Sequence, residues 1–162
     1  MRSTPSHGPR PDAGTGAAIR EALREYPVIL TIPVEWGDQD ALGHVNNTVY
    51  LRWCETARVV YLERAGMWQR IEKEGRGPIL AHIGCNFRRQ VTFPDTMHIG
   101  SRVTRIGNSS IRMEHCIVGE AEGAVVADAD STMVFYDYRA GASLAVPQDL
   151  RDAISKLEGK PL

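Results

Sequence analysis

The sequence predicts an α+β fold in which one antiparallel sheet packs around a single long, apolar helix. The segment 47–64 carries apolar residues well beyond a single helical face, which is typical of a helix mostly surrounded by protein. The segments after it alternate apolar and polar residues over strand-length runs joined by turn residues. The chain has 162 residues, of which 43% are hydrophobic, so we expect one domain with a real core. A sheet that curls around one apolar helix would bury both elements.

The N-terminal segment is expected to be a disordered tail. Residues 1–17 are rich in Gly, Pro, Ser and Thr, and they cannot bury enough apolar surface to offset the entropy of ordering them. We therefore expect a single domain over residues 18–162, with a short helix over residues 18–25.

A first strand is predicted over Val28–Trp36, where apolar and polar residues alternate. Pro33 cannot donate a hydrogen bond to a neighbouring strand, which favours an edge position or a bulge. A loop dense in Gly, Asp and Asn follows the strand.

The long helix is predicted from about Asn47 to Arg64. Asn46 or Asn47 suits the N-cap, because its side-chain oxygen can accept a hydrogen bond from an unpaired backbone N–H. Gly66 suits the end of the helix.

Four more strands and a closing helix are predicted after a turn-rich link. The strands are expected over 79–93, 97–106, 111–117 and 124–138, and the helix over 148–157. Because tight turns join these strands, we expect a meander and therefore an antiparallel sheet of five strands in all.

Charge and cysteine content exclude several classes of protein. The chain has 19 Lys and Arg against 20 Asp and Glu, a balance that argues against a nucleic-acid partner or a basic membrane anchor. No apolar run approaches the roughly 20 residues needed to span a bilayer, and no N-terminal stretch has the form of a signal peptide. The three cysteines show no metal-ligand spacing. We expect a cytoplasmic protein with no metal, no membrane partner and reduced thiols.

A motif at fixed spacing spans the loop and the start of the helix. Its residues are Asp38, Asp40, Gly43, His44, Val45, Asn46, Asn47, Tyr50, Glu55, Ala57 and Arg58. The motif resembles the signature region of hotdog-fold thioesterases of the 4-hydroxybenzoyl-CoA thioesterase type. The resemblance covers about residues 28–140, and it implies a hotdog fold, in which a five-stranded antiparallel sheet wraps around a long central helix.

Thioester hydrolysis needs a carboxylate that attacks the carbonyl or activates water, and donors that meet the developing oxyanion. The residues alone do not choose between Asp38 and Asp40, because alternating side chains put both on one side of an extended segment. The resemblance favours Asp40 as nucleophile or general base, with Glu55 on the helix as the second candidate. It also implies that the backbone N–H of Asn47 is the oxyanion donor and that Gly43 shapes the turn. Unpaired N–H groups at a helix start suit that role.

Other residues are candidates for substrate contact. His44 could orient a water or the carbonyl group, and Asn46 could bind substrate beside its capping role. Tyr50 faces either the core or an acyl pocket. Arg88 and Arg89 are candidates to meet the phosphates of coenzyme A.

We therefore expect an acyl-CoA thioesterase with no cofactor, since coenzyme A is part of the substrate. An acyl-carrier-protein thioesterase and a non-catalytic acyl-binding protein are the alternatives. A sheet of this kind leaves an exposed edge. The resemblance implies that two sheets pair edge to edge, so we expect a homodimer or homotetramer with the site between subunits. Glu55 and Arg58 are expected to pair with each other or across that boundary.

Overall fold

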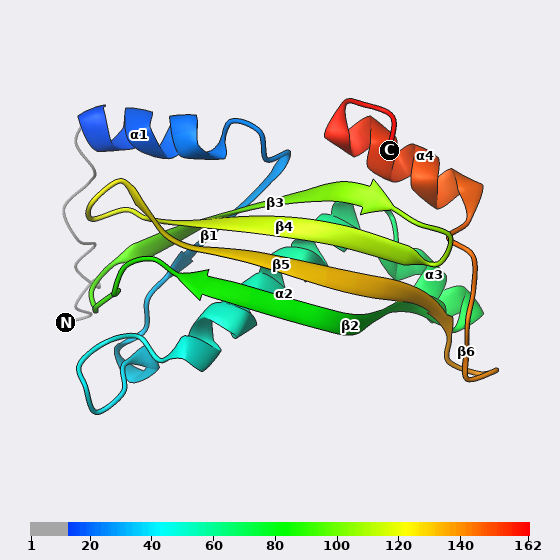
Figure 1. Ribbon diagram of the computed structural model, residues 1–162, viewed down its shortest axis with the longest axis horizontal. Helices are drawn as coiled ribbons and strands as arrows, with labels where there is room; N and C mark the ends of the chain where they lie inside the picture. Colours follow the sequence, from blue (N-terminus) through cyan, green and yellow to red (C-terminus); the bar gives the residue numbers. More distant parts are fainter. Residues whose placement is uncertain (1–12) are drawn as a thin grey trace, which may run out of the picture.

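A computed structural model describes residues 13–162, which form one antiparallel sheet with helices on both faces (Figure 1). The helices are α1 (Ala13–Leu23), α2 (Asn47–Arg64), α3 (Trp68–Glu74) and α4 (Gln148–Glu158), with a 3-10 turn η1 (Trp36–Asp38). The strands are β1 (Val28–Pro33), β2 (Arg76–Phe87), β3 (Thr96–Ile106), β4 (Ser110–Gly119), β5 (Ala124–Asp137) and the two-residue β6 (Ala142–Ser143). The predicted α+β class and the antiparallel sheet are confirmed.

The order of the strands corrects the predicted meander. The sheet runs β1-β3-β4-β5-β2, and β6 pairs with β5. Thus β3, β4 and β5 do form a meander, but β2 pairs with β5 rather than with its neighbour in sequence. A strand has two edges, and those of β3 are occupied by β1 and β4. The strand β2 therefore lies at one edge of the sheet and β1 at the other.

The helix α2 has the bounds that the sequence predicts. Asn46 is its N-cap, and its side chain accepts a hydrogen bond from the Thr48 N–H. Gly66, one residue past the C-cap, has a φ of +74°, a left-handed conformation that suits glycine. One side of α2 is buried against the sheet, while Arg52 and Glu55 on the other side are exposed. The expectation that protein surrounds most of this helix is therefore wrong for a single chain.

The N-terminal helix also differs from its prediction. It begins at Ala13, so residues 13–17 are helical and not part of a disordered tail. Ile19 and Leu23 of α1 pack against Cys116 and Val118 on one face of the sheet, which anchors the helix. Residues 1–12 of the expected tail lie outside the described residues.

Two strands end earlier than predicted. The first ends at Pro33, because the chain turns into η1 and the Val34 N–H bonds to the carbonyl of Asp95. The strand expected to reach residue 93 ends at Phe87, where the N–H groups of Arg88 and Arg89 both bond to the Val126 carbonyl.

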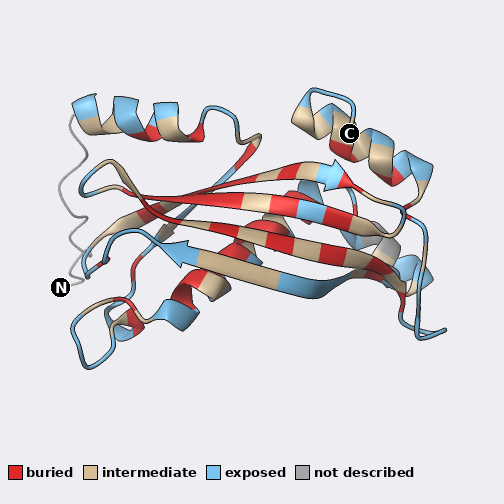
Figure 2. Cartoon of the chain, in the orientation of Figure 1, coloured by how far each residue is buried: buried red, intermediate tan, exposed pale blue. Residues whose placement is uncertain are grey.

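The core lies between α2 and the opposite face of the sheet from α1. Trp53, Cys54 and Ala57 of α2 pack there in one cluster with Ile117 and Ala127 of the sheet. Figure 2 shows β3, β4 and β5 banded with buried residues, whereas β2 is mostly half-buried or exposed. The edge strand β2 is thus the least buried of the long strands.

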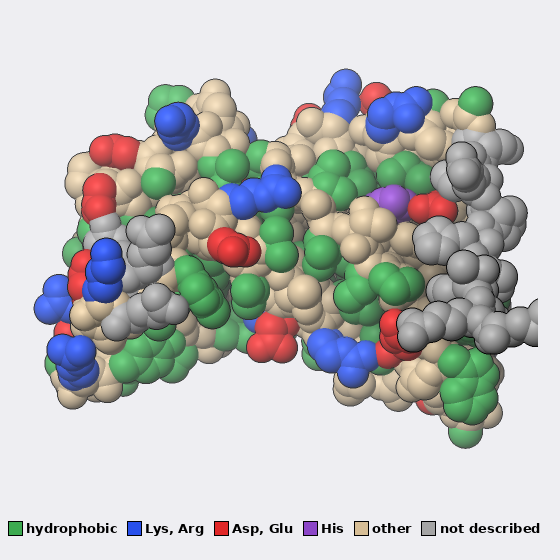
Figure 3. Space-filling model, turned by 180° about the vertical axis from the view of Figure 1, so that it is seen from behind, with side chains coloured by type: hydrophobic (Ala, Val, Ile, Leu, Met, Phe, Trp, Pro, Cys, Tyr) green, Lys and Arg blue, Asp and Glu red, His purple; other side chains and the backbone are tan. Residues whose placement is uncertain are grey.

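Basic and acidic side chains are interspersed on the face seen in Figure 3, so neither sign of charge dominates it. No helix within residues 13–162 is long and apolar enough to cross a membrane.

Candidate active site

The loop between β1 and α2 gives its two aspartates different environments. Asp38 is buried, accepts a hydrogen bond from the Glu35 N–H at 2.9 Å and forms an ion pair with Arg52. Its backbone carbonyl accepts from the Asn46 N–H at 2.9 Å. Asp38 therefore holds the loop against the helix, and its carboxylate is committed to protein partners.

Asp40 is exposed, and a tight turn fixes its carboxylate. One oxygen, Oδ1, accepts a hydrogen bond from the Leu42 N–H at 2.8 Å. The Asp40 N–H bonds to the His44 carbonyl at 2.9 Å, and the Gly43 N–H bonds to the Asp40 carbonyl at 3.0 Å. Gly43 has a φ of +78°, which a residue with a Cβ rarely adopts. Within residues 13–162, the second carboxylate oxygen of Asp40 has no hydrogen-bond partner.

The start of α2 presents a free donor. The Asn46 side-chain oxygen accepts from the Thr48 N–H at 2.9 Å and from the Thr48 hydroxyl at 2.7 Å. The Asn47 N–H, the first of the helix, has no acceptor in the described part of the chain. Such an N–H carries the positive end of the helix dipole and can stabilise a developing negative charge.

A cavity of about 400 Å³ brings these groups together. It is lined by Asp40, His44, Val45, Asn47, Tyr50, Phe87, Arg88, Arg89 and Gln90. All of the predicted site residues except Gly43 and Asn46 therefore border one cavity. Gly43 shapes the turn and Asn46 caps the helix, so neither lines the cavity itself.

Two contacts join the opposite walls of this cavity. The Val45 N–H bonds to the Val91 carbonyl at 2.8 Å, and the Gln39 side chain accepts from the Phe93 N–H at 3.0 Å. The loop that carries Asp40 is thereby held against the segment that follows β2. Sequence reasoning selected Arg88 and Arg89 by their charge, but it missed Phe87 and Gln90 on either side of them, because neither residue carries a local signal of a binding site.

Aromatic rings form the apolar part of the cavity wall. The ring of Tyr50 lies 5.1 Å from that of Phe87, at 84°, and 5.1 Å from that of Trp53. Burial raises the pKa of Tyr50 to about 12, so its hydroxyl remains a neutral donor at ordinary pH. Its side chain thus belongs to the core and to the cavity at once.

The two predicted phosphate-binding arginines differ in their partners. Arg88 pairs with Asp128, which also accepts from the Asn86 amide at 2.7 Å, and this pairing lowers the pKa of Asp128. Arg89 lies 3.2 Å from Glu122, and both of these side chains are well exposed. Both ion pairs are exposed and therefore contribute little free energy, but the Arg89 contact is the longer of the two, so Arg89 is the more easily released.

Glu55 and Arg58 form no ion pair with each other in the described chain, so the expected intrachain pairing is not found. Glu55 is exposed and does not line the cavity. Arg58 is buried, its Nη1 has no partner within residues 13–162, and burial lowers its pKa.

A polar cluster lies in the core. His115 is 1% exposed and lies between the hydroxyls of Ser101, 2.9 Å from Nδ1, and Ser131, 3.4 Å from Nε2. Burial, and then the charge of Arg58, lower the pKa of His115 to about 4.

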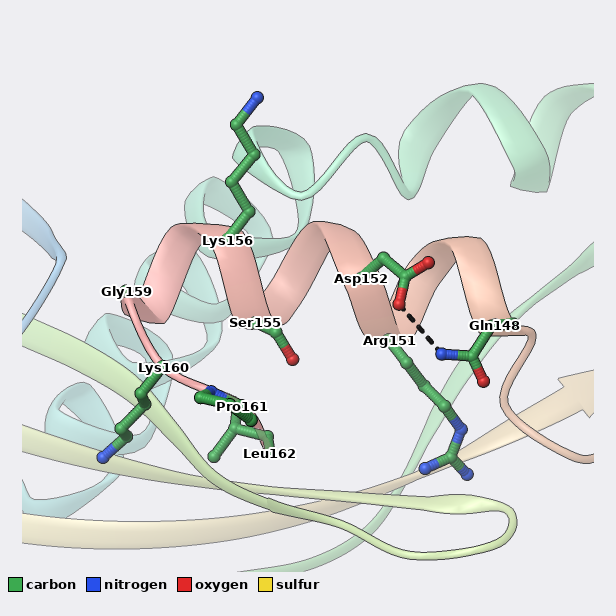
Figure 4. A pocket seen from close by; sticks show the side chains of 9 residues that line it. All are labelled: Gln148, Arg151, Asp152, Ser155, Lys156, Gly159, Lys160, Pro161 and Leu162. Carbon is green, nitrogen blue, oxygen red and sulfur yellow. Dashed lines mark hydrogen bonds between the residues drawn. The ribbon is translucent and has the colours of Figure 1, made fainter.

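A larger cavity, of about 650 Å³, lies beside α4 and the C-terminus (Figure 4). None of the predicted site residues lines it. Asp152 accepts a hydrogen bond from the Gln148 amide, and Figure 4 shows Lys156 and Lys160 pointing in different directions. Among residues 13–162, no group of three or more His, Cys, Asp or Glu side chains could hold a metal ion.

The chain is similar in sequence to known thioesterases. Residues 34–154 match a family described as the thioesterase-like superfamily. The chain is 31% identical to the long-chain acyl-CoA thioesterase FadM of Escherichia coli over 118 residues, 73% of this chain and 89% of that protein.

Solved structures give the same result. A thioesterase of Thermus thermophilus, determined with coenzyme A and Zn, superposes with a TM-score of 0.76 at 31% identity, covering 85% of this chain and 98% of that one. The PA5185 protein of Pseudomonas aeruginosa has a TM-score of 0.74 at 33% identity, covering 83% and 94%.

Proposed function

Because the chain belongs to the thioesterase-like superfamily and is a thioester hydrolase, we propose that it hydrolyses acyl-CoA thioesters to the free acid and coenzyme A. The observation that carries the proposal is the cavity that Asp40 and Asn47 line together. The relatives support coenzyme A as the thiol, since one is a long-chain acyl-CoA thioesterase and another was determined with coenzyme A.

Asp40 is the proposed catalytic carboxylate, because one of its oxygens is held by the Leu42 N–H while the other is available to substrate. As general base, it takes a proton from a water whose oxygen bonds to the thioester carbonyl carbon. The C–S bond then breaks, and the proton passes to the departing sulfur. As nucleophile, it forms an acyl anhydride with release of the thiolate, and water cleaves the anhydride. Asp38 is excluded from this role by its burial and its ion pair with Arg52.

The Asn47 N–H is the proposed oxyanion donor. It is unpaired in the described chain, and the dipole of the 18-residue α2 points its positive end toward the cavity. A donor of this kind stabilises charge that develops only in the transition state, and its loss costs about 10²–10³ in rate in other enzymes. His44, half-buried beside Asp40, is proposed to orient the water or the carbonyl group.

Arg89 is proposed to meet the phosphates of coenzyme A, since within residues 13–162 its guanidinium is held by an exposed ion pair with Glu122 alone. Arg88 lines the same cavity while it stays bound to Asp128.

The test of this function is a hydrolysis assay with one acyl group carried on three thiols: coenzyme A, pantetheine and an acyl carrier protein. We expect turnover of the coenzyme A ester, with a lower KM than for the pantetheine ester, which lacks the nucleotide phosphates. Cleavage of the carrier-bound ester alone would replace coenzyme A by the carrier protein. Tight binding of all three without turnover would contradict the proposed activity.

We further propose that two copies of the chain pair through β2. This strand spans Arg76–Phe87 at the edge of the sheet and has β5 as its partner on one side only within the described residues. Its unpaired backbone groups offer hydrogen bonds to a second sheet. Because Phe87 and Arg88 lie where β2 ends, such pairing would bring a second chain close to the cavity.

A further inference from the structure

The part of β2 that faces α2 is the open part of the sheet. Residues that lie directly opposite each other in antiparallel strands point to the same face. On β5 the residues of this face are buried, whereas their β2 partners are half-buried or exposed. The pairs are Ile83 with Ser131, Cys85 with Ala129, and Phe87 with Ala127. The apolar side of β2 is therefore incompletely buried, and Figure 2 shows β2 mostly in tan and blue, the colours of half-buried and exposed residues.

Phe87 is the end of this apolar side and also part of the cavity wall. Its side chain is 50% exposed, while Tyr50, on which its ring packs edge to face, is only 3% exposed. The uncovered aromatic surface therefore belongs to Phe87. A half-exposed phenylalanine beside a catalytic carboxylate offers an apolar contact that no residue within 13–162 completes.

The packed core leaves no room for an apolar ligand between α2 and the sheet. One to two helical turns after Tyr50, the α2 residues Trp53, Cys54 and Ala57 are 2%, 0% and 0% exposed. A group attached to a carbonyl carbon near Asp40 cannot pass between α2 and the sheet there. The half-exposed Phe87 is the apolar surface that the cavity leaves open to such a group, and the half-buried Cys85 and Ile83 lie next to it on the same face of β2.

We propose that Phe87 is the specificity-determining residue of the site, and that its ring contacts an apolar acyl chain of the thioester. This inference rests on the proposed thioesterase function. It places the apolar acyl group on the β2 side of the cavity and the polar thiol carrier toward Arg89. Preference should therefore rise with the length of the acyl chain, because longer chains cover more of Phe87 and its apolar neighbours on β2.

The test compares kcat/KM for acetyl-, hexanoyl- and decanoyl-CoA in the wild type and in Phe87→Ala. We expect the ratio of decanoyl to acetyl activity to fall about tenfold in the variant, with acetyl-CoA hydrolysis changed much less. Phe87→Leu, which keeps an apolar side chain, should recover most of the lost ratio. Phe93→Ala is the matched control, since Phe93 is 42% exposed but does not line the cavity, and its backbone contact to Gln39 is unaffected.

The outcomes separate this inference from the proposed function. If the wild type hydrolyses none of the three esters, the proposed function fails. If the wild type is active but Phe87→Ala keeps the wild-type ratio, or lowers all three rates equally, Phe87 does not set specificity. A variant that keeps the ratio but changes the mass of the assembly would make Phe87 an interface residue instead.

Discussion

Two aspartates separated by one residue differ in burial and in partners in the loop before α2. Alternation along an extended segment puts Asp38 and Asp40 on one side, but the 3-10 turn η1 breaks the alternation after Trp36. Asp38 turns inward to Arg52 and the Glu35 N–H, while Asp40 stays at the surface with one free oxygen. Only the resemblance chose between them, because turn geometry of this kind is not readable from residue spacing.

Asn46 stabilises the start of α2 through its side chain. Asn46→Ala removes the acceptor of the Thr48 N–H, and we expect it to lower the free energy of unfolding by about 1 kcal/mol. Asn46→Asp keeps the acceptor and should unfold at nearly the wild-type urea concentration. Its negative charge beside the Asn47 N–H should nevertheless slow hydrolysis, because it opposes the developing oxyanion. Equal urea midpoints for wild type and Asn46→Ala would contradict the capping role.

The elements differ in how well the sequence predicts them. The bounds of α2 follow from local signals, namely a capping asparagine, a wide apolar stripe and Gly66 after its end. The approximate position of β2 also follows from local alternation of apolar residues. Its pairing with β5 does not, because such alternation does not identify the partner strand. Among the residues that line the cavity, one contiguous motif identified Asp40, His44, Asn47 and Tyr50, and charge identified Arg88 and Arg89. Phe87 and Gln90 carry no such local signal.

The edge position of β2 leads to a prediction about assembly. If two chains pair through β2, light scattering should give about twice the chain mass of 17.9 kDa, or a multiple of that dimer. Amide hydrogens of β2 should then exchange more slowly at high protein concentration than on dilution. A monomer mass with rapid exchange along β2 would contradict the pairing.

A polar cluster lies in the otherwise apolar layer between α2 and the sheet. The fold of the whole molecule is the expected hotdog arrangement, as the likeness to thioesterase structures confirms. His115, Ser101 and Ser131 come from three adjacent strands, and Arg58 reaches toward them from the helix side. Because these groups are buried, their protonation affects the stability of the entire fold.

His115 predicts how stability depends on pH. Its pKa is about 4 in the folded state, below its ordinary value of 6.5, because burial and Arg58 disfavour the charged form. The unfolded chain therefore binds a proton before the folded chain does. Stability is fully present above about pH 6.5 and falls between pH 6.5 and 4, by up to about 1.4 kcal/mol per pH unit. Urea unfolding of wild type and His115→Gln over this range checks it, and equal slopes would contradict it.

The most direct test of the account is the effect of Asp40→Asn on kcat for an acyl-CoA that the wild type hydrolyses. Asparagine keeps an oxygen for the Leu42 N–H, so the melting temperature should barely change. Loss of the carboxylate should lower kcat by about 100-fold or more. Glu55→Gln, which changes the exposed carboxylate outside the cavity, should retain nearly wild-type kcat. An Asp40→Asn enzyme with near wild-type kcat, or a Glu55→Gln enzyme without activity, would contradict the assignment of Asp40.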